Sequence, residues 1–266
     1  MKGVILGIAP EARLVDLTHE VPPQDVRAGA FLLRGAVPYF PLGTIHLAVV
    51  DPGVGGARRA LVVATRSALF VAPDNGLLSL VAPPSEVVGI WDVSESKHRL
   101  RKVSRTFHGR DVFAPIAARL VLRAPPVSLG KPVRSMVRLP GSKPRRDGSR
   151  TIGEVLWVDR FGNLITNIGA DDLPRAQPAR AAASRERGMA PRRSGAARSG
   201  SFRARPLSVT IGDAVLPLLS AYSDLAPGRA LALVNSADLV EIAVNQGSAA
   251  GHFDLAPGTR VVVTRR

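Results

Sequence analysis

Residues 45–56 read IHLAVVDPGVGG, an apolar run that ends in an aspartate and a glycine turn. Continuous apolar runs rich in Val, Ile and Leu are typical of strands buried on both faces. In α/β domains, ligands gather at the carboxyl ends of such strands. Asp51 stands at that end and Arg58 follows shortly after, so the turn brings both side chains toward one pocket. Asp51 as a turn cap and Arg58 as a surface charge explain the local pattern equally well.

Around this strand, residues 1–140 alternate strand-like and helix-like patterns. Such mixing predicts an α/β domain, with a Rossmann-like sheet covered by helices on both faces. The expected strands are 14–17, 44–50, 60–64, 68–71 and 87–93, and the expected helices are 23–36, 76–81 and 112–122.

The character of the chain changes after residue 150. Residues 141–150 are basic and contain Pro and Gly, which indicates a linker. Residues 151–266 show short apolar runs with turn signals and almost no helical pattern, which predicts a compact antiparallel β-barrel domain. Its expected strands are 151–158, 164–168, 207–211, 230–234, 240–244 and 260–264.

Composition excludes several classes of protein. The 266 residues are 45% hydrophobic and 21% charged, which is too apolar for global disorder. The absence of cysteine excludes a disulfide framework, a thiolate nucleophile and a Cys-ligated zinc site. No apolar run is long enough for a membrane span, and residues 4–9 are too short for a secretory signal, so we expect a soluble cytoplasmic protein.

The formal net charge of +15 is concentrated in one segment. The segment from Arg175 to Arg205 contains nine arginines and a single acidic residue, Glu186. This Ala-, Arg-, Ser- and Gly-rich segment lacks apolar side chains to bury, so residues 176–204 are expected to be a disordered insertion in the β domain. RNA binding through this segment is an alternative function, but we do not expect nucleic acid to be the main partner.

Three further motifs carry polar residues at element ends. TFHGRD at 106–111 precedes an apolar helix, with Thr106 or Asp111 as N-cap and His108 just outside the positive helix end, which disfavours its protonation. VDRFGNLITN at 158–167 joins a strand to a glycine turn, and NSADLVEIAVNQGSAA at 235–250 reads as a hairpin. Taken singly, each is also explained by an ordinary loop histidine or by turn-forming residues.

In their order, these motifs and the segments FPLGTIHLAVVDPGVGGARR, APDNGLL and FHGRDVFAPIAARL resemble one family. The chain is similar to the S-adenosylmethionine (SAM) hydroxide adenosyltransferases, relatives of the bacterial fluorinating and chlorinating enzymes. The resemblance covers nearly the whole chain apart from the Arg-rich insertion. It implies hydrolysis of SAM at the ribose C5′ to adenosine and methionine, without a metal or redox cofactor. It also implies a homotrimer, with substrate held between the N-terminal domain of one subunit and the C-terminal domain of its neighbour.

The resemblance assigns roles to individual residues. Asp51, Arg58 and His108 match the triad that positions and activates water. Asp159 matches a methionine-binding residue and Asn163 an adenine-binding residue. Three residues fall in the segment that closes on these groups: Ser236, Glu241 and Val244.

Two differences within the family bear on activity. Halogenating members carry an aromatic residue at the position of Asp51 and lack the counterpart of His108, so water is the expected nucleophile. The family normally begins with a strand and a TDFG-like segment, whose aspartate binds the ribose hydroxyls, and this part is missing ahead of Met1. The alternative function is therefore a non-catalytic protein that binds adenosine or SAM.

Overall fold

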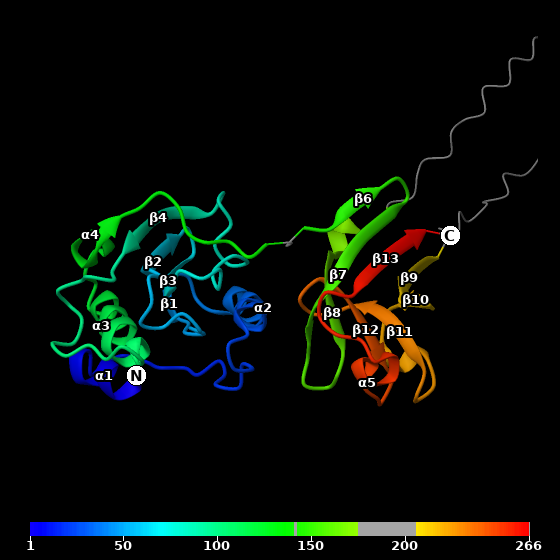
Figure 1. Cartoon of the computed structure of the whole chain (residues 1–266), viewed down its shortest axis with the longest axis horizontal. Helices are drawn as coiled ribbons and strands as arrows, with labels where there is room; N and C mark the ends of the chain where they lie inside the picture. Colours follow the sequence, from blue (N-terminus) through cyan, green and yellow to red (C-terminus); the bar gives the residue numbers. More distant parts are fainter. Residues whose placement is uncertain (141–142, 175–205, 266) are drawn as a thin grey trace, which may run out of the picture. The chain divides into compact units, whose positions relative to one another are not determined.

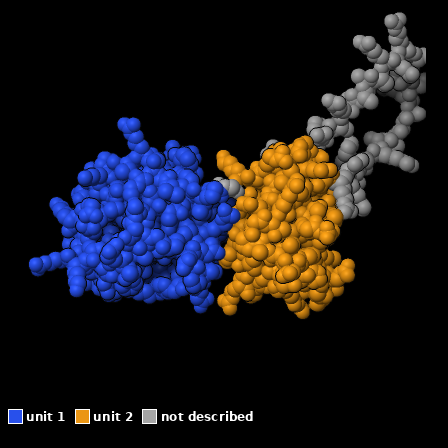
Figure 2. Space-filling view, in the orientation of Figure 1, with its two compact units in different colours: residues 1–142 blue, residues 143–266 orange. Residues whose placement is uncertain are grey.

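The computed structural model describes residues 1–140, 143–174 and 206–265, which form two compact units (Figure 1). Unit 1 spans Met1–Ser142 and unit 2 spans Lys143–Arg266. Each unit has a hydrophobic core of its own, and Figure 2 colours the two units separately. The expected Arg-rich insertion at 176–204 lies outside the described residues.

Unit 1 is built on a five-stranded sheet in the order β1-β3-β2-β4-β5. Its strands are β1 (Thr44–Leu47), β2 (Ala60–Thr65), β3 (Ala68–Pro73), β4 (Val87–Asp92) and β5 (Lys131–Pro132). β1 pairs with β3 in parallel, and the other neighbours pair antiparallel. Only two residues join β2 to β3, a connection too short for a parallel crossover. The Rossmann-like character that we expected is therefore not confirmed, because a Rossmann sheet is mostly parallel.

Helices nevertheless cover both faces of this sheet (Figure 1). Alternate residues of β2 and β3 point to opposite faces. Leu61 and Phe70 pack with α2 (Val26–Ala36), whereas Val62 and Val71 pack with the helices that follow residue 108. Those helices are the π-helical turn η2 (Gly109–Phe113) and α3 (Ala114–Val121), on which α1 (Lys2–Ile8) packs. The remaining helices of unit 1 are η1 (Val37–Tyr39) and α4 (Pro126–Leu129).

Two local predictions for unit 1 are wrong, and one helix was not predicted. Residues 14–17 form no strand, and Val15 and Leu17 are exposed to solvent. Residues 76–81 form successive turns rather than a helix, beginning at Gly76 with φ +96°. Residues 2–8 form α1, a helix that was not predicted, and its two glycines in seven positions weaken helix propensity. Burial of Ile5 against α3 compensates for that weakness.

Unit 2 is a closed barrel of seven strands in the order β13-β9-β10-β11-β12-β8-β7, with β13 also paired to β7. Its strands are β6 (Arg145–Asp147), β7 (Arg150–Val158), β8 (Leu164–Gly169), β9 (Leu207–Ile211), β10 (Ala214–Leu219), β11 (Ala230–Val234), β12 (Leu239–Val244) and β13 (Arg260–Arg265). The barrel is antiparallel as expected, except that β10 pairs with β11 in parallel. β6 extends β7 as a hairpin, so part of the expected linker at 141–150 is a strand.

The barrel interior is filled by alternate residues of its strands. Val240, Ile242 and Val244 of β12 belong to the central core, whereas Ala243 packs on the outer face with Leu231. The short helix α5 (Ala249–Phe253) contributes to the core, and the turns η3 (Ala170–Asp172) and η4 (Tyr222–Asp224) follow β8 and β10. This alternation places residue 241 on the outer face of the barrel.

Candidate active site

Asp51 and Arg58 lie on the turn that follows β1. The N–H of Val54 donates to the carbonyl of Asp51 and closes the turn. Nε of Arg58 donates to the two carboxylate oxygens of Asp51 at 2.9 and 3.1 Å, and Nη2 donates to Oδ2 at 2.5 Å. The Asp51 side chain is 5% exposed and that of Arg58 is 10% exposed. A buried pair with several hydrogen bonds holds both groups in one orientation.

His108 completes an array of three side chains. Its Nδ1 lies 2.8 Å from Nη2 of Arg58. A guanidinium group can only donate, so Nδ1 accepts the hydrogen bond and the neutral ring carries its proton on Nε2. Burial, and then the charge of Arg58, lowers the pKa of His108, which favours the same neutral form. The structure thus brings together the three residues expected to converge, which we call the Asp51–Arg58–His108 array.

The segment around His108 differs from the helix start that we expected. His108 precedes the π-helical turn η2, and neither Thr106 nor Asp111 is its N-cap. Asp111 lies inside the turn and is fully buried. Its carboxylate accepts the N–H of Ser104 at 2.7 Å and the guanidinium of Arg110 at 2.6 Å. These bonds close the loop that carries the histidine, and π-helical turns are frequent at functional sites.

The two loops of the array meet at Gly55. This residue has φ +75°, and a Cβ built on it would lie 2.1 Å from the carbonyl oxygen of Arg105. Only glycine adopts this conformation freely and allows so close an approach of two backbones. Gly55 therefore sets the distance between the turn that carries Arg58 and the loop that carries His108.

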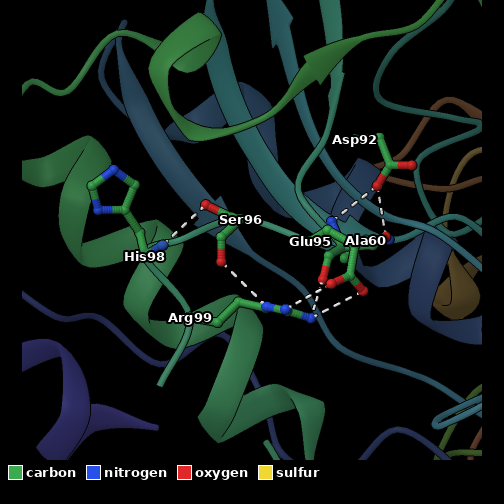
Figure 3. A network of polar contacts seen from close by, with 7 residues as sticks. Ala60, Asp92, Glu95, Ser96, His98 and Arg99 are labelled. Atoms are coloured by element: carbon green, nitrogen blue, oxygen red, sulfur yellow. Dashed lines mark hydrogen bonds and ion pairs between the residues drawn. The ribbon is translucent and has the colours of Figure 1, made fainter. Parts of the chain in front are cut away.

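A polar network orders the segment between β4 and the histidine loop (Figure 3). The Arg99 guanidinium donates to the Glu95 carboxylate at 2.7 Å and to the carbonyl of Ser94 at 2.5 Å. The hydroxyl of Ser94 accepts the N–H of Ala60 at 2.8 Å. Arg99 also contributes to the lowered pKa of His108, although less than burial and Arg58.

A cavity of about 410 Å³ lies beside the array, with Asp51 in its wall. This volume is within the range of small-molecule sites. Most of the lining residues are Val or Pro, but polar and apolar atoms share the exposed wall about equally, and Gln24, whose backbone has a positive φ of 68°, adds an amide. The wall is formed by Val21, Pro22, Pro23, Gln24, Val49, Val50, Asp51, Pro52 and Val54.

In unit 2, Asp159 and Asn163 form a single turn between β7 and β8. Oδ1 of Asp159 accepts the N–H groups of Phe161 and Asn163 at 2.8 and 2.9 Å. Nδ2 of Asn163 donates to Oδ2 of Asp159 at 3.0 Å. Asn163 is buried, and these hydrogen bonds fix its side chain against that of Asp159. The same contacts are typical of residues that form an ordinary turn.

Glu241 is a buried carboxylate on the outer face of the barrel. The hydroxyl of Tyr222 donates to its Oε1 at 2.6 Å, and Nδ2 of Asn235 donates to its Oε2 at 3.1 Å. Burial raises the pKa of Glu241, and the nearby Asp159 carboxylate raises it further. Burial, the bond to Glu241 and the same Asp159 charge also raise the pKa of Tyr222. Two carboxylates and a tyrosine therefore share one region of unit 2. The unit 2 cluster consists of Asp159, Asn163, Tyr222, Asn235 and Glu241.

The other two residues expected to bind substrate, Ser236 and Val244, form no hydrogen bond with these carboxylates in the part of the chain that the structure describes. Ser236 is exposed in the turn between β11 and β12. Val244 is 6% exposed, and its side chain packs in the barrel core. Because this side chain faces the core, a contact of Val244 with a ligand would use the backbone, whose carbonyl also accepts the N–H of Gly247.

Comparison with known proteins identifies the family. The model of the SAM hydroxide adenosyltransferase N-terminal domain matches residues 1–130, and that of the C-terminal domain matches residues 153–262. The chain belongs to the SAM hydroxide adenosyltransferase family.

Relatives within this family span nearly all of the chain. A (R)-S-adenosyl-L-methionine hydrolase of Salinispora tropica is 39% identical, over 98% of this chain and 90% of its own length. A fluorinase of Actinoplanes sp. is 26% identical, over 99% of this chain and 91% of its own. The crystal structure of an uncharacterized conserved protein from Thermotoga maritima superposes with a TM-score of 0.81 at 34% identity, covering 99% of this chain and 93% of that one.

In this member of the SAM hydroxide adenosyltransferase family, two contacts of the unit 2 cluster were missed by sequence reasoning. Tyr222 and Asn235 hold Glu241, yet Tyr222 lies in no motif and Asn235 reads as a turn former. Within the described ranges, no three His, Asp or Glu side chains are grouped so as to hold a metal ion. No helix there has the length and apolarity to cross a membrane.

Proposed function

We propose that this chain hydrolyses SAM to adenosine and methionine. The observation that carries the proposal is the hydrogen-bonded Asp51–Arg58–His108 array beside a small-molecule cavity, in a family whose curated relatives include SAM hydrolases. In the reaction, the oxygen of water forms a bond to C5′ of the ribose while the C5′–S bond breaks. The sulfur keeps the electron pair and leaves as the neutral thioether of methionine, and one water proton is released. The leaving group needs no acid, so catalysis consists of placing and activating the water.

The array divides this task among its three members. The positive charge of Arg58 favours hydroxide character in a water that touches it. The Nε2–H of His108 is free of the bond to Arg58 and donates to the water oxygen, which orients it. Asp51, the carboxylate of the array, takes up the water proton.

The unit 2 cluster is proposed to bind the substrate rather than to act on it. The carboxylates of Asp159 and Glu241 have hydrogen bonds from amide, hydroxyl and backbone donors, which leaves their negative charge available to the ammonium group of methionine. Asn163 is proposed to bind adenine. Ser236 is proposed to close over the methionine part and Val244, through its backbone, over the adenine part.

We further propose that the chain acts as a homotrimer in which unit 1 of one subunit and unit 2 of its neighbour share a substrate. The family resemblance supports this arrangement. Light scattering after gel filtration measures the subunit number. Mixing an Asp51→Asn protein with an Asn163→Ala protein tests the sharing, because mixed trimers regain sites with both residues intact. Activity that stays at the level of the separate variants after subunit exchange would argue against shared sites.

The reaction is tested by incubating the full chain with SAM in water labelled with heavy oxygen. We expect adenosine with one label in its 5′-hydroxyl, together with unlabelled methionine. Chelator should leave the rate unchanged, since no metal or redox cofactor takes part in the proposed chemistry. Added fluoride or chloride should give no halogenated nucleoside, because Asp51 and His108 favour water. Tight SAM binding without products would instead support the non-catalytic alternative.

A further inference from the structure

The dipeptide Asp74-Asn75, which follows β3, contacts both segments that carry the ion pair of the array. Nδ2 of Asn75 donates to the carbonyl of Val50 at 2.8 Å, directly before Asp51. The N–H of Asp74 donates to the carbonyl of Arg59 at 2.9 Å, directly after Arg58. The two halves of the ion pair are thus tied to neighbouring residues of one short segment.

Side-chain hydrogen bonds add to the backbone contact between Asp74 and Arg59. The Arg59 guanidinium donates to Oδ2 of Asp74 at 2.6 and 2.8 Å and to the carbonyl of Ser135 at 2.9 Å. Oδ1 of Asp74 accepts the N–H of Val137 at 2.7 Å. The Asp74 side chain is 4% exposed and that of Arg59 is 34% exposed, so the Asp74 end of this pair is shielded from water. Asp74 therefore anchors Arg59 to the segment that leads to the end of unit 1.

We propose that Asp74 and Asn75 are positioning residues for the Asp51–Arg58–His108 array. Neither touches the reacting atoms. They fix the backbone on both sides of the ion pair, which keeps the Arg58 guanidinium in line with Asp51 on one side and His108 on the other. This inference rests on the proposed function only for its catalytic consequence, since misplacement of a catalytic group by about 1 Å costs up to roughly a hundredfold in rate.

Asn75 offers the sharper test, because one of its side-chain hydrogen bonds reaches the segment of Asp51 and the other only closes a local turn. Its Nδ2 reaches Val50, whereas its Oδ1 accepts the N–H of Leu77 at 3.2 Å and so forms an ordinary turn. Asn75→Asp keeps the acceptor for the turn and loses the donor to Val50. We expect both Asn75→Ala and Asn75→Asp to lower kcat by roughly tenfold or more, with KM changed by less than about threefold.

Ser79 provides a matched control in the same unit. Its hydroxyl donates to the carbonyl of Gly76 at 2.6 Å and accepts the N–H of Leu139 at 2.8 Å, but neither bond reaches the array. Ser79→Ala should cost similar thermal stability and keep kcat within about twofold. Wild-type kcat in Asn75→Asp would reduce Asn75 to a turn former and overturn the proposal. An equal loss of kcat in Ser79→Ala would do the same.

A second readout separates this inference from the proposed function. The pKa of His108 is measured by nuclear magnetic resonance of its ring nitrogens, with a His108→Gln protein for assignment. The charged groups that act on this ring are Arg58, Asp51, Asp111 and Arg99. We expect the His108 pKa to rise toward its ordinary value in Asn75→Ala, because Arg58 no longer stays beside it, and to stay at the wild-type value in Ser79→Ala. An unchanged His108 titration in Asn75→Ala refutes the positioning role, even if the wild-type protein yields no adenosine.

Discussion

The Asp51–Arg58–His108 array and the unit 2 cluster differ in the hydrogen-bond partners of their buried carboxylates. In unit 1, Asp51 is buried against a cation, and Arg58 also reaches His108. In unit 2, Glu241 is buried against neutral donors, and burial raises its pKa. A carboxylate that is paired internally holds its neighbours in place, whereas one that lacks an internal cation favours a positive ligand. The comparison therefore suggests that unit 1 supplies the chemistry and unit 2 supplies affinity for a cationic substrate.

The largest effect should come from Asp51→Asn, which keeps the size of the side chain and removes its charge. We expect the rate of adenosine formation to fall by roughly a hundredfold or more, with a smaller change in KM, because a positioned proton acceptor is lost. Steady-state kinetics measures both parameters. Asp16→Asn is the control, since Asp16 pairs with Lys2 on the surface and should leave the rate unchanged. Full turnover in Asp51→Asn would remove the distinction between a chemical unit 1 and a binding unit 2.

Gly55→Ala should have the next largest effect, because it separates the loops of the array without altering its members. The added Cβ would meet the Arg105 carbonyl, so one backbone must move. We expect kcat to fall by roughly thirtyfold from misplacement of the array. Gly43 is a matched control, since it also has a positive φ but nothing within 4 Å of its Cβ position. If Gly43→Ala lowers kcat as strongly, the effect of Gly55 reflects backbone strain rather than loop spacing.

Asn163→Ala sharpens the comparison from the side of unit 2. A substrate group left without its partner weakens binding by about 1 to 3 kcal/mol, so we expect KM to rise roughly tenfold while kcat changes less. Calorimetry with SAM gives the affinity directly. Thr151→Ala serves as control, because the buried hydroxyl of Thr151 donates to the carbonyl of Asp172 and stabilises the barrel away from the cluster. A fall in kcat with unchanged KM would assign Asn163 to the chemistry instead.

Local patterns predicted most of the barrel and less of unit 1. The apolar runs at Leu207–Ile211 and Ala230–Val234 became β9 and β11 with the expected bounds. β10 (Ala214–Leu219) was not predicted, and it contains Pro217, a residue that argues against a central strand but lies opposite Ser208 of β9 here. In unit 1, strand direction was the main error, since apolar content shows burial but does not show which neighbour pairs in parallel.

Contacts between residues close together in the sequence were easier to predict than contacts between distant residues. Asp51 and Arg58 share one turn, so the local pattern allowed their contact, although a turn cap and a surface charge explained that pattern equally well. His108 joins them from fifty residues away, and only the family resemblance placed it there. The bond of Tyr222 to Glu241 and that of Asn75 to Val50 arise from tertiary packing, for which no single motif gives a signal.

The smallest expected effect is a difference in how the two units respond to acid. His46 is 6% exposed between Phe40 and Phe70, and its Nε2 has no hydrogen-bond partner within the described part of the chain. Burial lowers the pKa of His46 below its ordinary 6.5, so unfolded chains bind a proton first. Unit 1 should therefore lose stability as the pH falls below about 6.5.

Glu241 predicts the opposite slope for unit 2. Its pKa is raised above its ordinary 4.5, so the folded unit binds the proton more readily than the unfolded chain. The contribution of this group to stability is complete below about pH 4.5 and is lost as the pH rises through the folded pKa. Between about pH 4.5 and 6.5, acid should thus weaken unit 1 through His46 and strengthen unit 2 through Glu241.

The chain allows each unit to be followed separately, because Trp91 lies on β4 and Trp157 lies on β7. Proteins that keep one tryptophan, made with Trp157→Phe or Trp91→Phe, report denaturant unfolding of one unit by fluorescence. His46→Phe should flatten the pH dependence seen by Trp91 and leave that seen by Trp157 unchanged. Glu241→Gln should do the reverse, since the glutamine oxygen can accept from Asn235 and its amide can donate to the Tyr222 oxygen without a titrating charge. Slopes of the same sign for Trp91 and Trp157 that neither substitution alters would show that these two buried groups do not distinguish the units.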